Sequence, residues 1–386
     1  MRYRRFGRLN WMVSVLGFGA MRLPILDGDP SKVNEPEAIR MIRYAIDHGV
    51  NYVDTAYPYH GGNSEVVVGK ALMDGYRERV KVATKMPMGR INKREELDQI
   101  FNEQLRRLQL DHIDFYLLHG LNRENWRKTI DLNVLDWAEQ QIKEGKIGYF
   151  GFSFHDEFEV FKEIIDGYSK WTFCQIQYNY IDVESSRRTP GTKGLKYAAS
   201  RGLAIVIMEP IRGGLLAVTP PKEVQEIWLN AEIKRSPAEW AILWVWNHPE
   251  VSVALSGMST MEQVTENIQI ADRSAPNILK PKELEIIAEV RERYLRYGFV
   301  GCTGCQYCTP CPQGVSIPSI LAIYNEVLRS NDSQMPGVIE RYNASIPPEN
   351  RADRCVKCGL CERKCPQNLP IRRLLSQIQW ILRMPS

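Results

Sequence analysis

The sequence predicts a parallel α/β barrel followed by a small cysteine-rich domain. Short apolar stretches alternate eight times with amphipathic helical stretches between residues 13 and 270, which is typical of parallel strands joined by helices. The chain has 386 residues, more than the roughly 250 of one (β/α)8 TIM barrel, so a second domain is expected. Of the nine cysteines, all but Cys174 lie between Cys302 and Cys365. We therefore expect the barrel in residues 1–297 and the second domain in residues 298–386.

The expected strands follow one another through the first domain. Residues 4–19 begin with a hairpin that closes one end of the barrel. A doubly wound open sheet is the alternative, but no G-x-G-x-x-G sequence follows the first strand. The eight expected strands comprise residues 13–19, 50–56, 80–85, 113–119, 147–152, 172–178, 203–208 and 251–255.

A helix is expected after each strand, because apolar residues recur at helical spacing there. One example is residues 66–73, for which Ser64 is the expected N-cap. Another is a single long helix that fills the stretch from His119 to about Gly145. The other six helices comprise residues 35–48, 94–108, 156–166, 194–201, 237–247 and 261–270. Beyond the barrel we expect helices in 281–297, 317–328 and 371–384, and a polar, irregular stretch in 331–354.

Composition argues against nucleic-acid and membrane partners. The formal net charge of +4 is small, and no basic run with interleaved aromatic residues is present. The apolar stretch from Trp240 to Trp246 is too short to cross a bilayer. The basic N-terminus leads into no apolar signal core. We expect a cytoplasmic protein, in which closely spaced cysteines indicate metal binding rather than disulfides.

Four polar residues occur where three successive expected strands end. Asp54, Lys85 and His119 each close an apolar strand, and Tyr59 lies on the loop after the first of these strands. Burying a lysine or a histidine without a partner costs several kcal/mol, so such positions are uncommon in a purely structural core. The carboxyl ends of barrel strands are also where barrel enzymes place their catalytic groups.

In this order and context, the four residues resemble the active-site tetrad of the aldo-keto reductases, and the resemblance extends from about Tyr3 to Asp272. It implies that Tyr59 is the general acid of carbonyl reduction, that Lys85 lowers the pKa of Tyr59, and that Asp54 is the partner of Lys85. A neutral His119 would orient the substrate carbonyl.

Tyr57 is the competing tyrosine, but the family spacing favours Tyr59. The resemblance also implies a bound NADPH or NADH. Ser153 and Gln175 match the residues that hold the nicotinamide carboxamide, and Phe154 stands where the family has a polar residue. Met208 replaces an aromatic ring that stacks on the nicotinamide.

The remaining cofactor contacts are also implied by matching positions. Residues 210–215, with Pro210, Arg212, Gly213 and Leu215, match the loop that covers the pyrophosphate. The segment for the adenosine end contains Gly257, Ser259, Gln263 and Asn267. Because Gly257 and Gln263 stand where members selective for the 2′-phosphate have basic residues, we expect weak discrimination or a preference for NADH.

Two cysteine runs lie in the second domain. The run Cys355, Cys358, Cys361 and Cys365, followed by proline, has the spacing of bacterial [4Fe–4S] ferredoxins. The run Cys302, Cys305, Cys308 and Cys311 is one residue shorter before its last cysteine. Zinc is the alternative, but a third cysteine and the Cys-Pro ending argue against it.

The similar endings of the two runs indicate an internal duplication, and their separation resembles an α-helical ferredoxin. In two-cluster ferredoxins the last cysteine of each run binds the other cluster. That resemblance implies one cluster on Cys302, Cys305, Cys308 and Cys365 and a second on Cys355, Cys358, Cys361 and Cys311. A single cluster is the alternative, because the shorter run could delete one site.

These expectations combine into an oxidoreductase that acts on a small-molecule carbonyl and that has a partner protein for electron transfer. Two alternatives stay open: a reductase with purely structural clusters, and an electron-carrying or redox-sensing protein on a catalytically silent barrel. Hydride transfer moves two electrons together whereas a cluster moves one, and no flavin motif is evident.

Overall fold

The computed structural model describes residues 1–328, 330 and 333–382. The chain forms two compact units. We call Met1–Pro210 with Glu239–Lys280 the barrel unit, and Ile211–Ala238 with the chain from Pro281 onward the C-terminal unit. Compared with the predicted boundary at residue 297, the structure groups residues 211–238 and 281–297 with the C-terminal segment.

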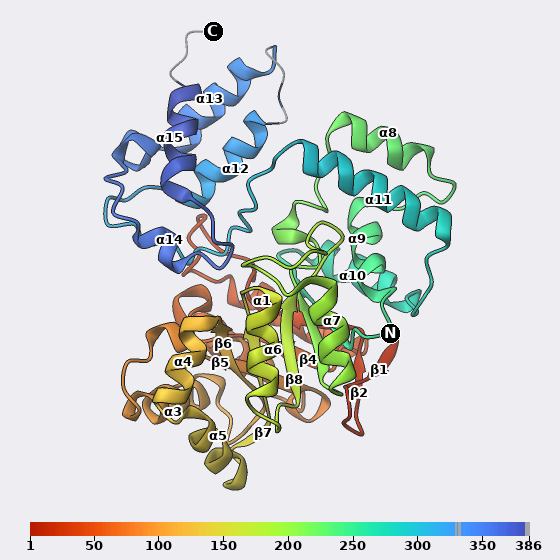
Figure 1. Ribbon diagram of the computed structural model, residues 1–386, viewed down its shortest axis with the longest axis vertical. Helices are drawn as coiled ribbons and strands as arrows, with labels where there is room; N and C mark the ends of the chain where they lie inside the picture. Colours follow the sequence, from red (N-terminus) through yellow and green to blue (C-terminus); the bar gives the residue numbers. More distant parts are fainter. Residues whose placement is uncertain (329, 331–332, 383–386) are drawn as a thin grey trace. The chain divides into compact units, whose positions relative to one another are not determined.

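Eight parallel strands form a closed barrel in the barrel unit, as predicted (Figure 1). The order around it is β10-β3-β4-β5-β6-β7-β8-β9, so the open-sheet alternative is wrong. Most strand residues are buried on both faces, which suits near-continuous apolar runs. The strands are β3 (Leu16–Gly19), β4 (Tyr52–Asp54), β5 (Lys81–Met86), β6 (Ile113–Leu121), β7 (Ile147–Phe154), β8 (Phe173–Gln177), β9 (Ala204–Met208) and β10 (Val253–Gly257).

The predicted N-terminal hairpin closes one end of this barrel. Strands β1 (Tyr3–Arg5) and β2 (Met12–Ser14) pair antiparallel. Phe6, which follows β1, is fully buried, and its ring centroid lies 4.7 Å from that of Phe115 on β6. The catalytic side chains are therefore expected at the opposite end, where the strands finish.

Helices surround the barrel strands (Figure 1). They are α1 (Glu35–Asp47), α2 (Asn63–Ala71), α3 (Glu95–Leu108), α4 (Arg123–Asp131), α5 (Val134–Lys143), α6 (Phe158–Asp166), α7 (Gly191–Ser200), α9 (Pro237–Trp246) and α10 (Met261–Asp272). The prediction of one long helix after His119 is wrong, because Asn133 adopts a left-handed conformation (φ 49°) between α4 and α5. The N-cap prediction for Ser64 is also wrong. α2 begins at Asn63, and the Ser64 hydroxyl donates to the Ala20 carbonyl.

The C-terminal unit is helical. Its helices are α8 (Lys222–Asn230), α11 (Pro281–Arg296), α12 (Ile317–Val327), α13 (Met335–Ser345), α14 (Leu360–Lys364) and α15 (Ile371–Ile381). Helix α13 corrects the irregular stretch predicted for 331–354, of which residues 331–332 lie outside the described residues. Residues 383–384 of the predicted closing helix also lie outside them.

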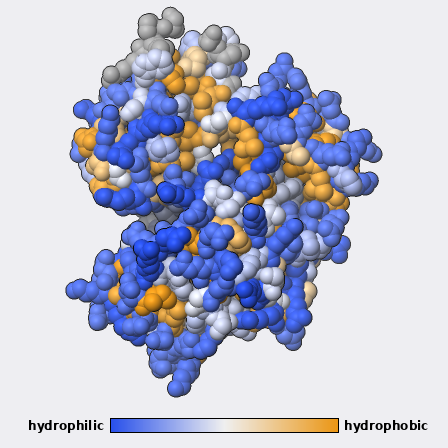
Figure 2. Space-filling model, in the orientation of Figure 1, coloured by the Kyte–Doolittle hydropathy of each residue, from blue (hydrophilic) through white to orange (hydrophobic). Residues whose placement is uncertain are grey.

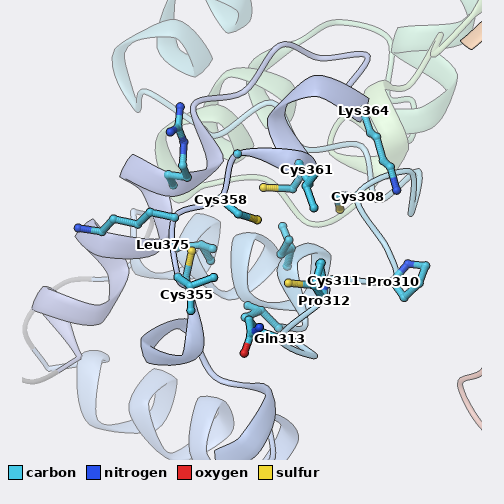
Figure 3. A pocket seen from close by; sticks show the side chains of 17 residues that line it. Cys308, Pro310, Cys311, Pro312, Gln313, Cys355, Cys358, Cys361, Lys364 and Leu375 are labelled. Atoms are coloured by element: carbon cyan, nitrogen blue, oxygen red, sulfur yellow. The ribbon is translucent and has the colours of Figure 1, made fainter.

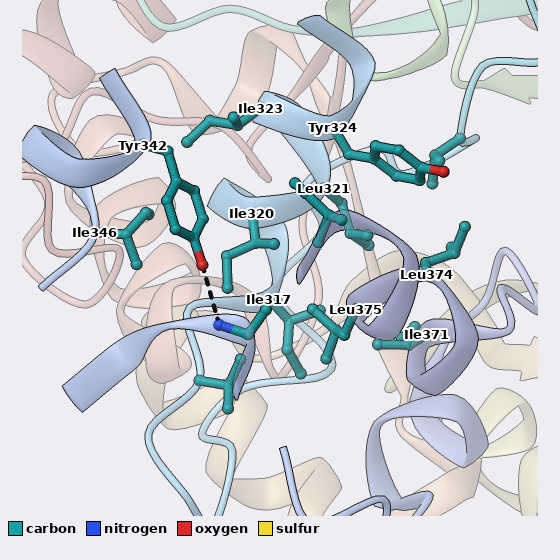
Figure 4. Close-up of a cluster of buried hydrophobic side chains, with 14 of the residues drawn as sticks. Ile317, Ile320, Leu321, Ile323, Tyr324, Tyr342, Ile346, Ile371, Leu374 and Leu375 are labelled. Atoms are coloured by element: carbon teal, nitrogen blue, oxygen red, sulfur yellow. Dashed lines mark hydrogen bonds between the residues drawn. The ribbon is translucent and has the colours of Figure 1, made fainter. Parts of the chain in front are cut away.

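One apolar core holds α12, α13 and α15 together (Figure 4). Ile320 and Ile378 are fully buried in it. Tyr342 is also buried there, and its hydroxyl accepts a hydrogen bond from the Ala352 N–H at 3.2 Å. This bond ties α13 to the segment that enters the second cysteine run.

Hydrophilic side chains cover most of the visible surface, with smaller hydrophobic areas among them (Figure 2). Such scattered apolar exposure is ordinary for a folded chain. Within the described residues, no helix combines the length and the apolar character that a membrane span needs.

Candidate functional site

A buried ion pair lies at the carboxyl end of the barrel. The Lys85 ammonium on β5 donates hydrogen bonds to Asp54 Oδ1 at the end of β4 and to the Thr55 carbonyl, both at 2.6 Å. Neither side chain is more than 3% exposed. Burial lowers the pKa of Lys85, and the negative charge of Asp54 opposes that fall. The two residues come from adjacent strands, so the sheet register itself brings them together.

Tyr59 and His119 lie beside this pair. The Lys85 nitrogen is 5.2 Å from the centroid of the Tyr59 ring. The Tyr59 and His119 rings meet edge-to-face, with centroids 6.0 Å apart. Burial lowers the pKa of His119 well below its ordinary value, and the Lys85 charge lowers it further. His119 is therefore a neutral imidazole at neutral pH. The structure thus brings all four tetrad residues together.

Tyr57 takes no part in this group. Its hydroxyl donates to Glu103 Oε2 on α3 at 2.7 Å, and the Arg107 guanidinium lies over its ring at 4.3 Å. The Tyr57 side chain is therefore held against α3 rather than beside Lys85. This arrangement favours Tyr59 as the reacting tyrosine.

Glu65 is a buried acid that sequence reasoning missed. Its carboxylate is fully buried and accepts hydrogen bonds from Thr84 and Gln104, both at 2.7 Å. It also pairs with Arg107 at 3.2 Å. Gln104 donates in addition to the Lys85 carbonyl at 3.1 Å, and the Glu65 charge helps to keep Lys85 protonated. A sequence signal existed, because Glu65 lies in the first turn of α2 and is followed by three valines.

Ser153 and Gln175 lie side by side on neighbouring strands, as the cofactor prediction requires. They are register partners on β7 and β8 and are 1% and 2% exposed. The Gln175 amide nitrogen contacts the Met208 sulfur at 3.7 Å. Its Oε1 atom is buried and has no hydrogen-bond partner among the described residues. An unpaired acceptor at this depth fits the amino group of a nicotinamide carboxamide.

Phe154 points away from Ser153 and Gln175. His155 is the next residue, directly after the end of β7. Phe154 packs against Phe161 of α6, with ring centroids 5.0 Å apart. His155 Nδ1 is buried and has no hydrogen-bond partner in the described structure. Burial lowers the pKa of His155 to about 4. Phe154 therefore offers no polar group toward Ser153 and Gln175, in line with the sequence expectation.

The adenosine segment contains a cation that the sequence match also missed. Arg22, from the loop after β3, runs along Gly257: a Cβ at this glycine would lie 3.1–3.2 Å from three Arg22 side-chain carbons. The Ser259 hydroxyl donates to the Arg22 carbonyl at 2.8 Å. Gln263 accepts a hydrogen bond from the Ser259 N–H. Asn267 is buried and donates to Ser256 at 2.9 Å.

The predicted pyrophosphate loop is divided between the two units. Pro210 ends the barrel portion, whereas Arg212, Gly213 and Leu215 belong to the C-terminal unit. Gly213 has a left-handed backbone (φ +65°), and a Cβ there would lie 2.6 Å from the Cα of Thr303. The loop is therefore in backbone contact with the first cysteine run.

Cys311 lies with the first three cysteines of the second run. Cys311, Cys355, Cys358 and Cys361 line one cavity, and their sulfur atoms point toward a common space (Figure 3). Cys308 of the first run also lines this cavity. In the part of the chain that the structure describes, no group of three His, Cys, Asp or Glu side chains is arranged to hold a single metal ion. Four thiols around a cavity are the donor set of a [4Fe–4S] cluster.

Cys365, the last cysteine of the second run, lies near the cysteines of the first run. Burial, together with the nearby thiols of Cys305, Cys302 and Cys365, raises the pKa of Cys308 to about 12. The last cysteine of each run is therefore located beside the other run. Both groupings match the exchanged pattern that the ferredoxin resemblance implies.

The two runs also share their backbone conformation. Gly304 and Lys357 occupy equivalent positions, with φ of 63° and 57°. Gln306 and Gly359 are equivalent, with φ of 67° and 77°. Gly314 and Asn368 repeat the pattern after the last cysteines, with φ of 69° and 49°.

Two protein-family models match this chain, each over a different range of residues. The model of the aldo/keto reductase family matches residues 15–292. The model of the 4Fe-4S dicluster domain matches residues 301–369.

Individual relatives resemble the barrel part. The uncharacterised oxidoreductase YrpG of Bacillus subtilis is 26% identical, over 71% of this chain and 92% of the relative. L-galactose dehydrogenase of Arabidopsis thaliana is 29% identical, over 69% of this chain and 86% of its own. The solved structure of aldo-keto reductase AKR11C1 from Bacillus halodurans, holo form, is 28% identical with a TM-score of 0.60, covering 75% of this chain and 96% of that one.

The family match spans most of the chain and coincides with the closed barrel and its polar carboxyl end. The second match coincides with the two cysteine runs. The protein therefore belongs to the aldo/keto reductase family and is an NAD(P)-dependent oxidoreductase with a C-terminal 4Fe-4S dicluster domain.

Proposed function

We propose that the barrel interconverts a small-molecule carbonyl and its alcohol, with Tyr59 as the group that gives or takes the proton. The observation that carries this is the buried Lys85–Asp54 pair with the Tyr59 ring 5.2 Å from the ammonium. A phenol donates a proton readily only where its phenolate is stabilised. Lys85 provides that stabilisation, and Asp54 directs the ammonium.

The other residues of the site position the reactants. A bound nicotinamide cofactor supplies the hydride. Ser153 and the unpaired oxygen of Gln175 hold the carboxamide, and Met208 lies beside Gln175. Neutral His119 donates a hydrogen bond to the carbonyl oxygen, which directs that oxygen toward Tyr59. The name of the relative L-galactose dehydrogenase makes sugars a first class of compounds to screen.

The reductase proposal is tested by replacing Tyr59 and Tyr57, one at a time, with phenylalanine. We expect Tyr59→Phe to lower the rate of NADPH-dependent carbonyl reduction by roughly 1,000-fold, because proton transfer in the transition state is lost. Cofactor affinity, measured by fluorescence titration, stays within about twofold of wild type. Tyr57→Phe is the matched control and retains its activity. Activity in Tyr59→Phe together with its loss in Tyr57→Phe would overturn the assignment.

We further propose two [4Fe–4S] clusters in the C-terminal unit. One is held by Cys302, Cys305, Cys308 and Cys365, the other by Cys311, Cys355, Cys358 and Cys361. The grouping of each set of thiols supports this, as does the repeated backbone of the two runs. The competing function, electron carriage on a silent barrel, predicts full cluster content without any carbonyl reduction.

A further inference from the structure

The second cysteine run lies at the surface of the C-terminal unit. Cys358 is exposed, whereas the other seven cysteines of the two runs are half-buried. Val356 is 62% exposed and Leu360 is 36% exposed. Both also line the cavity that the four thiols surround. A single layer of side chains therefore separates this cavity from solvent.

This exposed segment is strongly basic. Between Asp353 and Arg373 the sequence has six basic and two acidic residues, an excess equal to the formal net charge of +4 of the whole chain. Arg372 pairs with Glu362 at 2.6 Å. Lys357, Arg363 and Lys364 are exposed and form no ion pair with any described residue. Their charges therefore face solvent.

The first run repeats the left-handed positions of the second but has none of this charge. Residues 297–325 contain no Asp, Glu, Lys, Arg or His. Thr303 of this run is 3% exposed and packs against the Gly213 backbone. Where the first run has Gly304, the second has Lys357 in the same left-handed conformation, which costs a non-glycine residue roughly 1 kcal/mol. The two halves of the duplication thus share these left-handed positions but differ in exposure and charge.

We propose that the exposed segment, which we call the basic face (Val356, Lys357, Leu360, Arg363 and Lys364), docks an acidic one-electron carrier protein. The proposal rests on the cluster content proposed above. Opposite charges steer the encounter, and the two apolar side chains provide a dry centre beside Cys358. One electron passes from the reduced centre of the carrier to the adjacent cluster. The carrier is oxidised by one electron, and no bond forms or breaks.

The test uses the full-length protein with its clusters and an acidic plant-type ferredoxin as the probe. Reduction of the clusters by the reduced ferredoxin is followed by anaerobic stopped-flow absorbance at about 50 mM and about 300 mM salt. Binding of oxidised ferredoxin is measured by calorimetry. We expect Lys357→Glu/Lys364→Glu to lower both the rate and the affinity at least about tenfold and to remove most of the salt dependence.

The matched control is Lys193→Glu/Lys196→Glu, which makes the same change in charge on exposed residues of α7. We expect its rate and affinity to stay within about twofold of wild type. Iron and sulfide counts and reduction by dithionite must equal the wild-type values in both variants. If Lys357→Glu/Lys364→Glu loses the cluster, the variant Lys357→Asn/Lys364→Gln is tested in its place, because asparagine tolerates the left-handed backbone.

Three results would each overturn the proposal. The first is an equal loss of rate and affinity in both double variants. The others are a wild-type rate that does not depend on salt, and binding of basic cytochrome c as tight as that of the acidic ferredoxin. A chain that holds no iron would instead contradict the cluster assignment on which the proposal rests. The iron count separates the two failures.

Discussion

The Arg22 side chain lies along Gly257, which the family resemblance, together with Gln263, aligns with the adenosine end of the cofactor. A Cβ at Gly257 would lie 3.1–3.2 Å from the arginine stem, so the glycine lets this side chain pack closely. The cation thus comes from the loop after β3. If this segment holds the adenosine end of the cofactor, we expect Arg22 to pair with the 2′-phosphate of NADPH, contrary to the preference for NADH expected from the sequence.

We expect Arg22→Ala to raise the KM for NADPH about tenfold and to leave the KM for NADH nearly unchanged. A tenfold change corresponds to about 1.4 kcal/mol, within the range of one charged contact. The measurement is steady-state kinetics with both cofactors. Arg273→Ala is the control, since that arginine is exposed and pairs with Glu239. An equal rise in KM for both cofactors would mean that Arg22 contacts a group that NADH and NADPH share.

His155 makes the stability of the barrel unit depend on pH. Its pKa is lowered by burial to about 4, below the ordinary value near 6.5. The unfolded state therefore binds the proton more readily, so this contribution to stability is complete above pH 6.5 and is lost as the pH falls toward 4. Between pH 7 and pH 5 we expect the free energy of unfolding, measured with urea, to fall less in His155→Gln than in the wild type. His48→Gln, at an exposed position, should leave the wild-type loss unchanged.

At the scale of secondary structure, the barrel could be predicted because its strands are short, apolar and buried on both faces. The tetrad could be predicted as well, since Asp54, Lys85 and His119 each end a strand and the parallel register brings strand ends together. Arg22 and Glu65 could not be assigned, because their roles depend on contacts between residues far apart in the sequence. The break at Asn133 was missed because only its left-handed backbone separates two apolar helical faces.

The loop after β9 approaches the backbone of the first cysteine run closely at Gly213. Gly213 and Gly214 both have positive φ, of 65° and 97°. A Cβ at Gly213 would lie 2.6 Å from the Thr303 Cα, whereas a Cβ at Gly214 would meet nothing within 4 Å. Alanine at either position costs about 1 kcal/mol in backbone conformation, but only Gly213→Ala must also move Thr303.

We expect Gly213→Ala to speed hydrogen exchange in residues 211–218 and in the first cysteine run by at least about tenfold. Gly214→Ala should affect only the loop itself. Comparison of the two variants by mass spectrometry isolates the contact with Thr303. Unchanged exchange around Cys302 in Gly213→Ala would mean that the contact does not stabilise the first run.

At the scale of the whole molecule, the C-terminal unit is assembled from two separate stretches of chain. Residues 211–238 leave the barrel between β9 and α9 and join the chain from Pro281 onward. Within the unit, α8 packs beside α11, and Arg235 forms an ion pair with Glu283. The sequence showed the change in composition near residue 298 but not this insertion, because its residues have no cysteine or repeat to mark them.

Exchange of the last cysteines would make each cluster a link between the two runs, and this can be tested by comparing pairs of variants. If Cys311 belongs to the second set, Cys311→Ser and Cys358→Ser damage the same cluster and give the same electron paramagnetic resonance spectrum after reduction. Cys365→Ser and Cys305→Ser should then share a different spectrum. Iron should fall from about eight to about four per chain in all four variants.

Without the exchange, Cys311→Ser would instead resemble Cys305→Ser. The barrel unit has its own core and makes no use of these thiols. We therefore expect its thermal unfolding to persist in all four variants, while the C-terminal unit loosens as its cross-links are lost. Circular dichroism follows the barrel, and proteolysis beyond Pro281 follows the C-terminal unit. Loss of the barrel transition in any of these variants would show that the clusters stabilise both units.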